Sequence, residues 1–128
     1  MIKISPVSIS QPGVKGGGTY KYYGRISGRE QVSFRFLAKT LSQRTTLSTI
    51  DVVAALEGFR EIIMEQLLEG NNVKLDGLGI FSLSVRTEGV DDPSKLNKSL
   101  VKDVKINFLP DPELKKQLKT AKFQFKRQ

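Results

Sequence analysis

The chain contains neither cysteine nor histidine. Without cysteine it has no disulfide, no thiolate metal site and no cysteine nucleophile. Without histidine it also lacks the commonest general base and the commonest zinc ligand. No nucleophile–base pair and no metal-binding cluster is visible in what remains. We therefore predict a protein that is not an enzyme, with no metal, no other cofactor and no small-molecule substrate.

Long apolar runs are missing as well. The longest uninterrupted aliphatic run covers residues 52–56, far short of the ~20 residues that a membrane-spanning helix needs. The first ten residues, MIKISPVSIS, have neither the apolar core nor the cleavage pattern of a signal peptide. We expect no membrane partner and a cytoplasmic location.

Positive charge is what the chain has in excess. Its 128 residues suffice for one domain with a modest core, and they carry a net charge of +8. Such a charge favours polyanionic partners, nucleic acid first and an anionic membrane surface second. Residues 1–50 hold eight basic residues and one acidic residue, and residues 95–128 hold ten and three, whereas residues 51–94 sum to −6. A polyanion site is expected toward the two ends of the sequence.

The first 32 residues form an N-terminal extension without a strong fold signature. Residues 2–9 alternate apolar and polar side chains, but Pro6 limits them to an edge strand at best. Residues 11–18 predict a flexible glycine-rich loop, and residues 19–27 a second strand. Tyrosines alternate with basic residues in that second strand, a pattern that suits base stacking but is explained more simply by a half-buried edge strand.

Two helices are predicted next. Apolar residues at 34, 37, 38 and 41 lie on one face of a short helix. Ser48 and Asp51 then form a capping-box-like start for a longer helix that ends before Gly70. The longer helix is apolar over more than half of its circumference, more than a short partner helix can cover. We therefore predict a homodimer.

The rest of the chain alternates strands with polar segments. Residues 73–75 and 80–85 predict strands, residues 87–100 a polar, turn-rich connection, and residues 101–109 a returning strand. Asp111 and Pro112 are typical of a helix start, so a last helix is expected over residues 111–118. Residues 119–128 form a basic tail.

Gly77 and Gly79 frame a Gly-x-Gly motif. A dinucleotide-binding fingerprint needs a third glycine and a following helix, and a phosphate-binding P-loop needs Gly-Lys-Ser/Thr. Both requirements fail here, because the residues that follow, IFSLSV, predict a strand. A glycine turn between two antiparallel strands is the simpler interpretation.

Two helices, a glycine turn between strands, a long polar segment, a returning strand and a last helix follow one another in this sequence. With this order of elements, the chain resembles the HU/IHF family of bacterial histone-like DNA-bending proteins. The resemblance covers residues 33–118, and its motif Gly-x-x-Val-x-Leu-x-Gly-x-Gly-x-Phe stands at Gly70, Val73, Leu75, Gly77, Gly79 and Phe81. The extension with Lys21-Tyr22-Tyr23 looks like the enlarged HU-related proteins of Bacteroidetes-type bacteria.

The resemblance implies an α+β fold. It has a helix-turn-helix base, a three-stranded antiparallel sheet with an extended β-ribbon arm, and a short C-terminal helix, in an intertwined homodimer. It also implies a nucleoid protein that binds double-stranded DNA through its phosphate backbone and minor groove, largely without sequence specificity, and bends or compacts it. The implied DNA-binding residues are Arg86, Lys95, Lys98, Lys102, Lys105, Gly77, Gly79 and Pro93. The implied core or dimer-interface residues are Phe59, Ile63, Leu67 and Phe81.

Alternatives remain open at the arm tip and for the function. Pro93 follows Asp91 and Asp92, whose carboxylates would repel phosphate, so Pro93 is either a wedge between base pairs or a plain turn proline. A dimeric protein-interaction scaffold with little DNA binding is one rival function. A sequence-selective, IHF-like regulator, possible as a heterodimer, is another.

Overall fold

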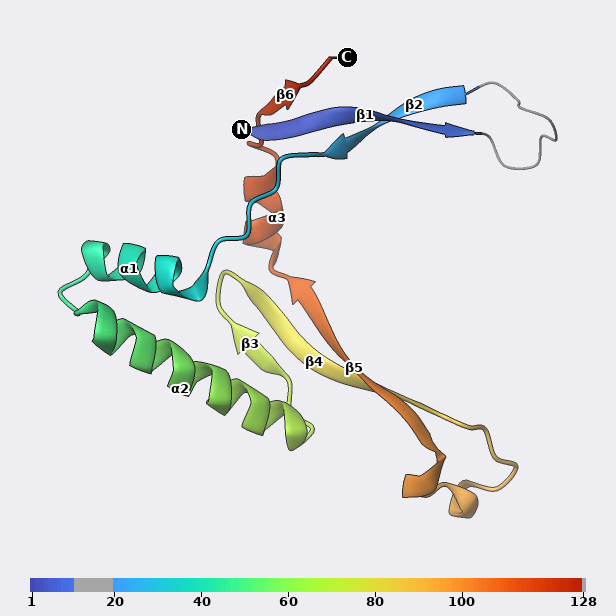
Figure 1. The fold of residues 1–128 in the computed structure, drawn as a ribbon. Helices are drawn as coiled ribbons and strands as arrows, with labels where there is room; N and C mark the ends of the chain where they lie inside the picture. Colours follow the sequence, from blue (N-terminus) through green and yellow to red (C-terminus); the bar gives the residue numbers. More distant parts are fainter. Residues whose placement is uncertain (11–19, 128) are drawn as a thin grey trace. The chain divides into compact units, whose positions relative to one another are not determined.

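The computed structural model describes residues 1–10 and 20–127, and the predicted loop at 11–18 lies outside them. These residues form a mixed α+β structure with three α-helices and two three-stranded sheets (Figure 1). The chain divides into two compact units. Ser33–Lys116 form the central unit, and Met1–Val32 together with Gln117–Gln128 form the terminal unit.

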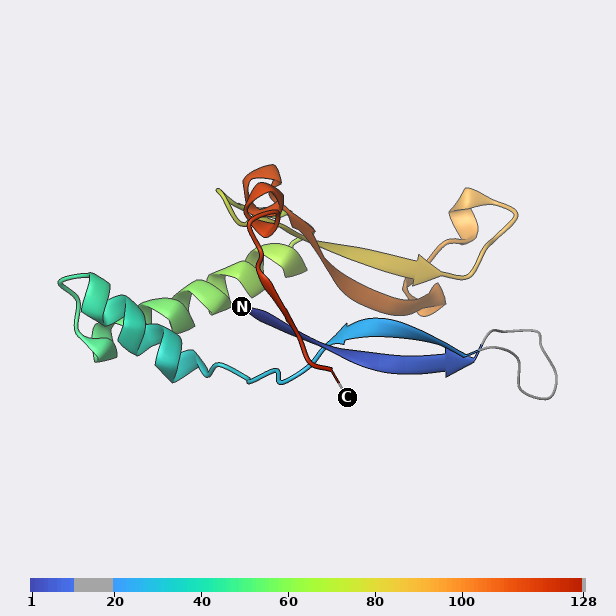
Figure 2. The same ribbon diagram turned by 90° about the horizontal axis from the view of Figure 1, so that it is seen from above.

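The central unit begins with two helices, α1 (Phe34–Arg44) and α2 (Thr49–Leu68), which lie side by side (Figures 1 and 2). Each starts at a serine whose side-chain oxygen accepts a backbone N–H. Ser33 Oγ lies 3.0 Å from the nitrogen of Phe36, and Ser48 Oγ lies 3.1 Å from that of Asp51. Such caps satisfy amides that have no partner inside the helix. Both predicted helices, and the predicted cap at Ser48, are confirmed.

The sheet of the central unit is antiparallel throughout, in the order β3-β4-β5. Its strands are β3 (Val73–Leu75), β4 (Gly79–Thr87) and β5 (Val101–Pro110). Because β3 is short, β4 and β5 continue past it as a two-stranded ribbon (Figures 1 and 2). Two 3-10 helices, η1 (Pro93–Lys95) and η2 (Lys98–Leu100), occupy the end of this ribbon. All three strands were predicted from the sequence.

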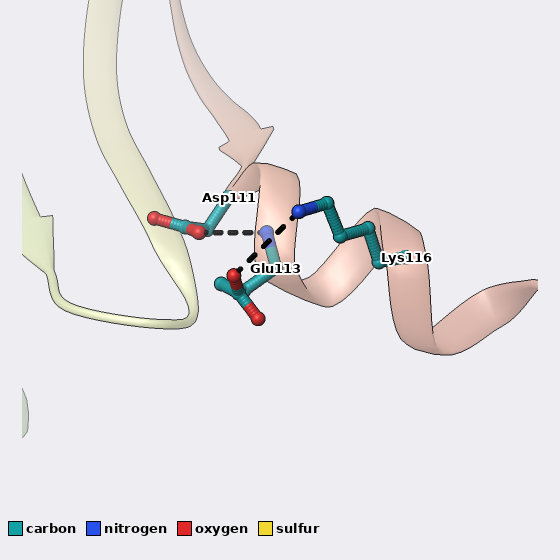
Figure 3. A network of polar contacts seen from close by, with 3 residues as sticks. All are labelled: Asp111, Glu113 and Lys116. Atoms are coloured by element: carbon teal, nitrogen blue, oxygen red, sulfur yellow. Dashed lines mark hydrogen bonds and ion pairs between the residues drawn. The ribbon is translucent and has the colours of Figure 1, made fainter.

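Helix α3 (Pro112–Leu118) follows β5 directly. Asp111 Oδ1 accepts the backbone N–H of Glu113 at 2.9 Å, and Lys116 Nζ lies 3.9 Å from Glu113 Oε1 (Figure 3). The ion pair is exposed and contributes little to stability. The cap and Pro112 at the first position therefore define where this helix begins, as the sequence predicted.

The terminal unit is a second sheet, which the predicted fold class did not include. Its strands are β1 (Ile2–Ser10), β2 (Tyr20–Ile26) and β6 (Phe123–Phe125), in the order β2-β1-β6. Strand β6 lies within the segment expected as a basic tail and pairs in parallel with β1.

The expectation that residues 2–9 form an edge strand is wrong, because β1 is the central strand of its sheet. Proline is tolerated there because β6 pairs only with the first part of β1, opposite Ile2, Lys3 and Ile4. Ile4 bonds toward β6, and Pro6, two residues further, faces the same side, where β6 no longer pairs. The missing N–H of proline therefore falls on the open side of the strand.

Apolar side chains of the central unit are only partly covered. Among the described residues, the apolar side chains that are fully buried are those of Ala38, Val52 and Leu67, on α1 and α2. Ile50 and Leu68, at the two ends of α2, are 81% and 74% exposed. A single copy of the chain therefore leaves the apolar surface of α2 largely in solvent. In the described part of the chain, no helix is long and apolar enough to cross a membrane.

Candidate nucleic-acid interface

The ribbon of β4 and β5 separates polar from apolar side chains. Residues directly opposite in an antiparallel pair share a face, and successive residues alternate between faces. One face, here the polar face, carries Ser82, Ser84, Arg86, Asp103, Lys105 and Asn107. The other, the apolar face, carries Phe81, Leu83, Val85, Val104, Ile106 and Phe108.

Arg86 and Lys105, two of the predicted DNA-binding residues, share the polar face. Lys105 is opposite Ser84 and Arg86 is opposite Asp103, so the two cations are diagonal neighbours. Backbone positions in that relation are about 7–8 Å apart. Both side chains are exposed. The arrangement presents two cations in a row, with the carboxylate of Asp103 beside Arg86.

Lys102 falls outside this alternation. The pairs Arg86↔Asp103 and Thr87↔Val101 leave Lys102 as the extra residue of a β-bulge. Its Nζ lies 3.7 Å from Glu88 Oε1, and both side chains are about half exposed. Such a pair is weak in water and can exchange for a phosphate.

Lys95 and Lys98 lie at the end of the ribbon, one in each 3-10 helix. Pro93 is the first residue of η1, where Asp92 Oδ1 accepts the N–H of Ser94 at 3.1 Å. Asn97 Oδ1 likewise accepts the N–H of Ser99 at 2.9 Å and starts η2. Pro93 and Asp92 thus have a local role in forming the turn, since proline has the φ that this position requires.

Gly77 and Gly79 form the turn between β3 and β4. Gly77 has a φ of +79°, a backbone conformation that other residues rarely adopt. At Gly79 an added Cβ would lie 2.6 Å from Phe108 Cε2 and closer still to the carbonyl oxygen of Leu109. The turn is held further by Leu78, which donates to the carbonyl of Leu75 at 3.0 Å and accepts from Asp111 at 3.0 Å. Gly77 is thus explained by its positive φ, and Gly79 by the close approach of this turn to β5.

A family model described as "HU domain fused to wHTH, Ig, or Glycine-rich motif" (HU-HIG) matches residues 5–127. The chain belongs to the HU-HIG family. No curated protein sequence matches it.

Two solved structures share the fold. A candidate bacterial DNA-binding protein from Bacteroides vulgatus ATCC 8482 superposes with a TM-score of 0.68 over 97% of the chain, at 12% sequence identity. The HU-HIG chain spans 47% of that protein's length. HU of Anabaena, in a cocrystal with DNA, superposes with a TM-score of 0.52 over 66% of the chain and 95% of the Anabaena chain, at 17% identity. At these identities the likeness shows the fold.

The predicted core and interface residues of the HU-HIG chain differ in their surroundings. Leu67 is fully buried, and Ile63 is partly buried. The ring of Phe81 packs on that of Phe108 with centroids 4.9 Å apart. Phe59 is 46% exposed, so within one copy of the chain it is not a core residue.

Sequence reasoning missed the three uncharged members of the polar face, Ser82, Ser84 and Asn107. The alternation in the sequence FSLSVR contained a signal for them. Only the register shows which residues of the returning strand stand opposite. Within the described residues, no group of three or more His, Cys, Asp or Glu side chains is placed to hold a metal ion.

Replacing Gly79 with alanine is expected to destabilise the HU-HIG chain by about 2 kcal/mol or more, because the new methyl group meets the Leu109 carbonyl and the Phe108 ring. The midpoint of urea unfolding measures the effect. Gly89→Ala is the matched control, since nothing lies within 4 Å of its added Cβ, and we expect a change within about 0.5 kcal/mol. Equal stabilities of the two variants would show that the turn does not depend on this close approach.

Proposed function

We propose that the chain is a non-catalytic architectural DNA-binding protein of the nucleoid. It binds double-stranded DNA largely without sequence specificity and bends or compacts it, without a cofactor. Membership of the HU-HIG family supports this proposal, as does the likeness to Anabaena HU, which was crystallised with DNA.

The ribbon with two distinct faces is the observation that carries the proposal. In the proposed complex, Arg86 and Lys105 meet phosphate oxygens from the polar face, while Lys95 and Lys98 add contacts from the ribbon end. Lys102 leaves Glu88 for a phosphate in this complex, because their exposed pair is weak. These contacts to the backbone carry no sequence information, which is why little specificity is expected.

The uncovered apolar surface of the central unit supports a homodimer. Phe59, Ile62 and Met64 of α2 are 46%, 56% and 44% exposed. Burial of such side chains stabilises by ~25 cal/mol per Å² of apolar area, so a second copy covering α2 is strongly favoured. A dimer also supplies two ribbons, one from each protomer, to embrace one duplex.

Bending follows if the ribbon end enters the minor groove. An apolar wedge there unstacks a base step at a cost of a few kcal/mol, which is offset by the larger surface that the bent DNA contacts. Pro93 is the candidate wedge of this chain. It starts η1 at the end of the ribbon and is exposed.

One observation favours a second candidate, a dimeric scaffold that binds protein partners. The central unit contains twelve basic and twelve acidic residues, so its net charge is zero. DNA binding by its ribbons then depends on local charges such as Arg86 rather than on the field of the whole unit.

The proposed dimer predicts a steep dependence of DNA binding on salt. The five basic side chains of the ribbon, doubled in the dimer, can neutralise about 6–10 phosphates, so affinity for a duplex of about 30 base pairs should fall at least ~10³-fold between ~50 and ~200 mM salt. Fluorescence anisotropy measures it. Unrelated competitor DNA should displace the duplex equally well, and poor competition would indicate a sequence-selective regulator instead. Absence of micromolar binding at the lower salt concentration would overturn the proposal.

Reversing the charges of the polar face is expected to weaken duplex binding. The double variant Arg86→Glu/Lys105→Glu removes two phosphate contacts per protomer and adds repulsion, so we expect a loss of at least ~100-fold at ~50 mM salt. Lys39→Glu is the control, because this lysine is exposed on α1, away from the ribbon. Unchanged binding by the double variant would favour the scaffold function.

Placing a charge on the uncovered face of α2 is expected to disrupt the dimer. Phe59→Glu puts a carboxylate where the proposed interface is apolar, at a cost of at least ~3 kcal/mol, or more than a hundredfold in the dimer dissociation constant. Sedimentation equilibrium measures this constant. Glu61→Gln, an exposed site on the same helix, should leave it unchanged. A wild-type chain that is monomeric at micromolar concentration would contradict the homodimer.

A further inference from the structure

The net positive charge of the chain resides in the terminal unit. That unit has nine basic residues and one acidic residue, whereas the central unit has twelve of each. The terminal unit therefore carries the whole excess of +8 on about a third of the residues. A small unit with this charge attracts polyanions irrespective of what the ribbon binds.

A groove lies on one face of the terminal sheet. It has a volume of about 520 Å³ and is lined by Ile4, Pro6, Tyr22, Tyr23, Gly24, Phe125, Lys126 and Arg127. Gly24 stands opposite Pro6 in the register, and together with Ile4 they share this face. An added Cβ on Gly24 would lie 2.7 Å from Ile4 Cγ2, so a side chain there would fill the groove.

Two aromatic rings stand on this face, one from each neighbour of β1. Tyr22 of β2 pairs with Ser8 of β1, and Phe125 of β6 pairs with Ile4 of β1, so both lie on the face of Ile4 and Pro6. The side chains are 69% and 67% exposed. The expected edge position of this strand is confirmed, but Tyr22 is more exposed than a half-buried strand implies.

Two cations accompany the rings. Lys126 and Arg127 continue β6 and line the groove, and the backbone N–H of Lys126 donates to the carbonyl of Ile4 at 2.8 Å. This hydrogen bond anchors the chain directly after Phe125, where β6 ends. The lining residues include no carboxylate.

We propose that this groove binds unpaired nucleotides of single-stranded DNA. Bases stack on Tyr22 and Phe125, and Lys126 and Arg127 contact the phosphates between them. Exposed aromatic rings beside cations are how proteins hold single strands, because every base has a flat π-face. A duplex hides those faces within its own stack, so the rings select for strands that are not paired.

This site is separate from the proposed duplex-binding ribbon, and each can fail without the other. The groove belongs to the terminal unit, and Arg86 and Lys105 belong to the central unit. Reversal of the ribbon charges should leave binding to single strands unchanged within about twofold.

Binding of a fluorescein-labelled oligo-dT of about 20 nucleotides, longer than the 4–16 that a single-strand-binding fold occupies, tests the proposal on the 128-residue chain. Tyr22→Ala and Phe125→Ala should each weaken binding about 5- to 150-fold, the range for loss of one stacked base. Tyr22→Phe should retain wild-type affinity, whereas Tyr22→Leu, which is apolar but cannot stack in this way, should not. Circular dichroism confirms that each variant is folded.

Phe123→Ala is the matched control, because Phe123 lies on the same strand and is 53% exposed but does not line the groove. It should bind oligo-dT like the wild type. No binding of oligo-dT, an equal loss in Phe123→Ala, or full affinity in Tyr22→Leu would each overturn the proposal. So would vesicles of anionic lipid that displace the oligonucleotide in the wild type and bind Tyr22→Ala more weakly, since the rings would then serve a membrane surface.

Discussion

The antiparallel pairing of β4 with β5 is the constraint on which the central unit depends. It runs from Gly79↔Pro110 to Thr87↔Val101 and begins where Gly79 allows the Leu109 carbonyl to approach. Since a shift of one residue moves every side chain to the opposite face, this register decides that Arg86 and Lys105 stand together. It also makes Lys102 the extra residue of a bulge, so that Lys102 has no residue opposite it on β4 and falls outside the alternation of the two faces.

The same pairing gives the ribbon an apolar face that one copy of the chain leaves open. Val85, Val104 and Ile106 are more than half exposed, as are several residues of α2. Exposed apolar surface on this scale is typical of subunits that fold by associating. In the proposed dimer, folding, association and DNA binding are therefore coupled, because the element that presents cations to DNA also presents apolar side chains to a partner.

The HU-like elements and the excess positive charge lie in different units of the chain. The HU-like elements lie in the electrically balanced central unit, whereas the excess of positive charge lies on the terminal sheet. The pairing of β6 with β1 produces this concentration by joining basic segments from both ends of the sequence. The proposed duplex-binding ribbon and the proposed single-strand groove thus belong to separate units of one chain.

Local signals in the sequence determined the helices and the order of the strands. Ser48 and Asp51 mark the start of α2, and Asp111 with Pro112 marks that of α3, because a helix cap involves residues only two or three positions apart. The motif from Gly70 to Phe81 identified the HU-like unit, and the positive φ of its Gly70 and Gly77 is a local requirement of the backbone at those positions. Tertiary structure alone decided what depends on distant residues. Strand β6 exists because Phe123 meets Ile2, Pro6 is tolerated because that pairing ends before it, and the aromatic groove forms only when both ends of the chain join one sheet. No nearby residue encodes the pairing of β6 with β1, because its free energy comes from hydrogen bonds and burial between two segments. These segments are more than a hundred residues apart in the sequence.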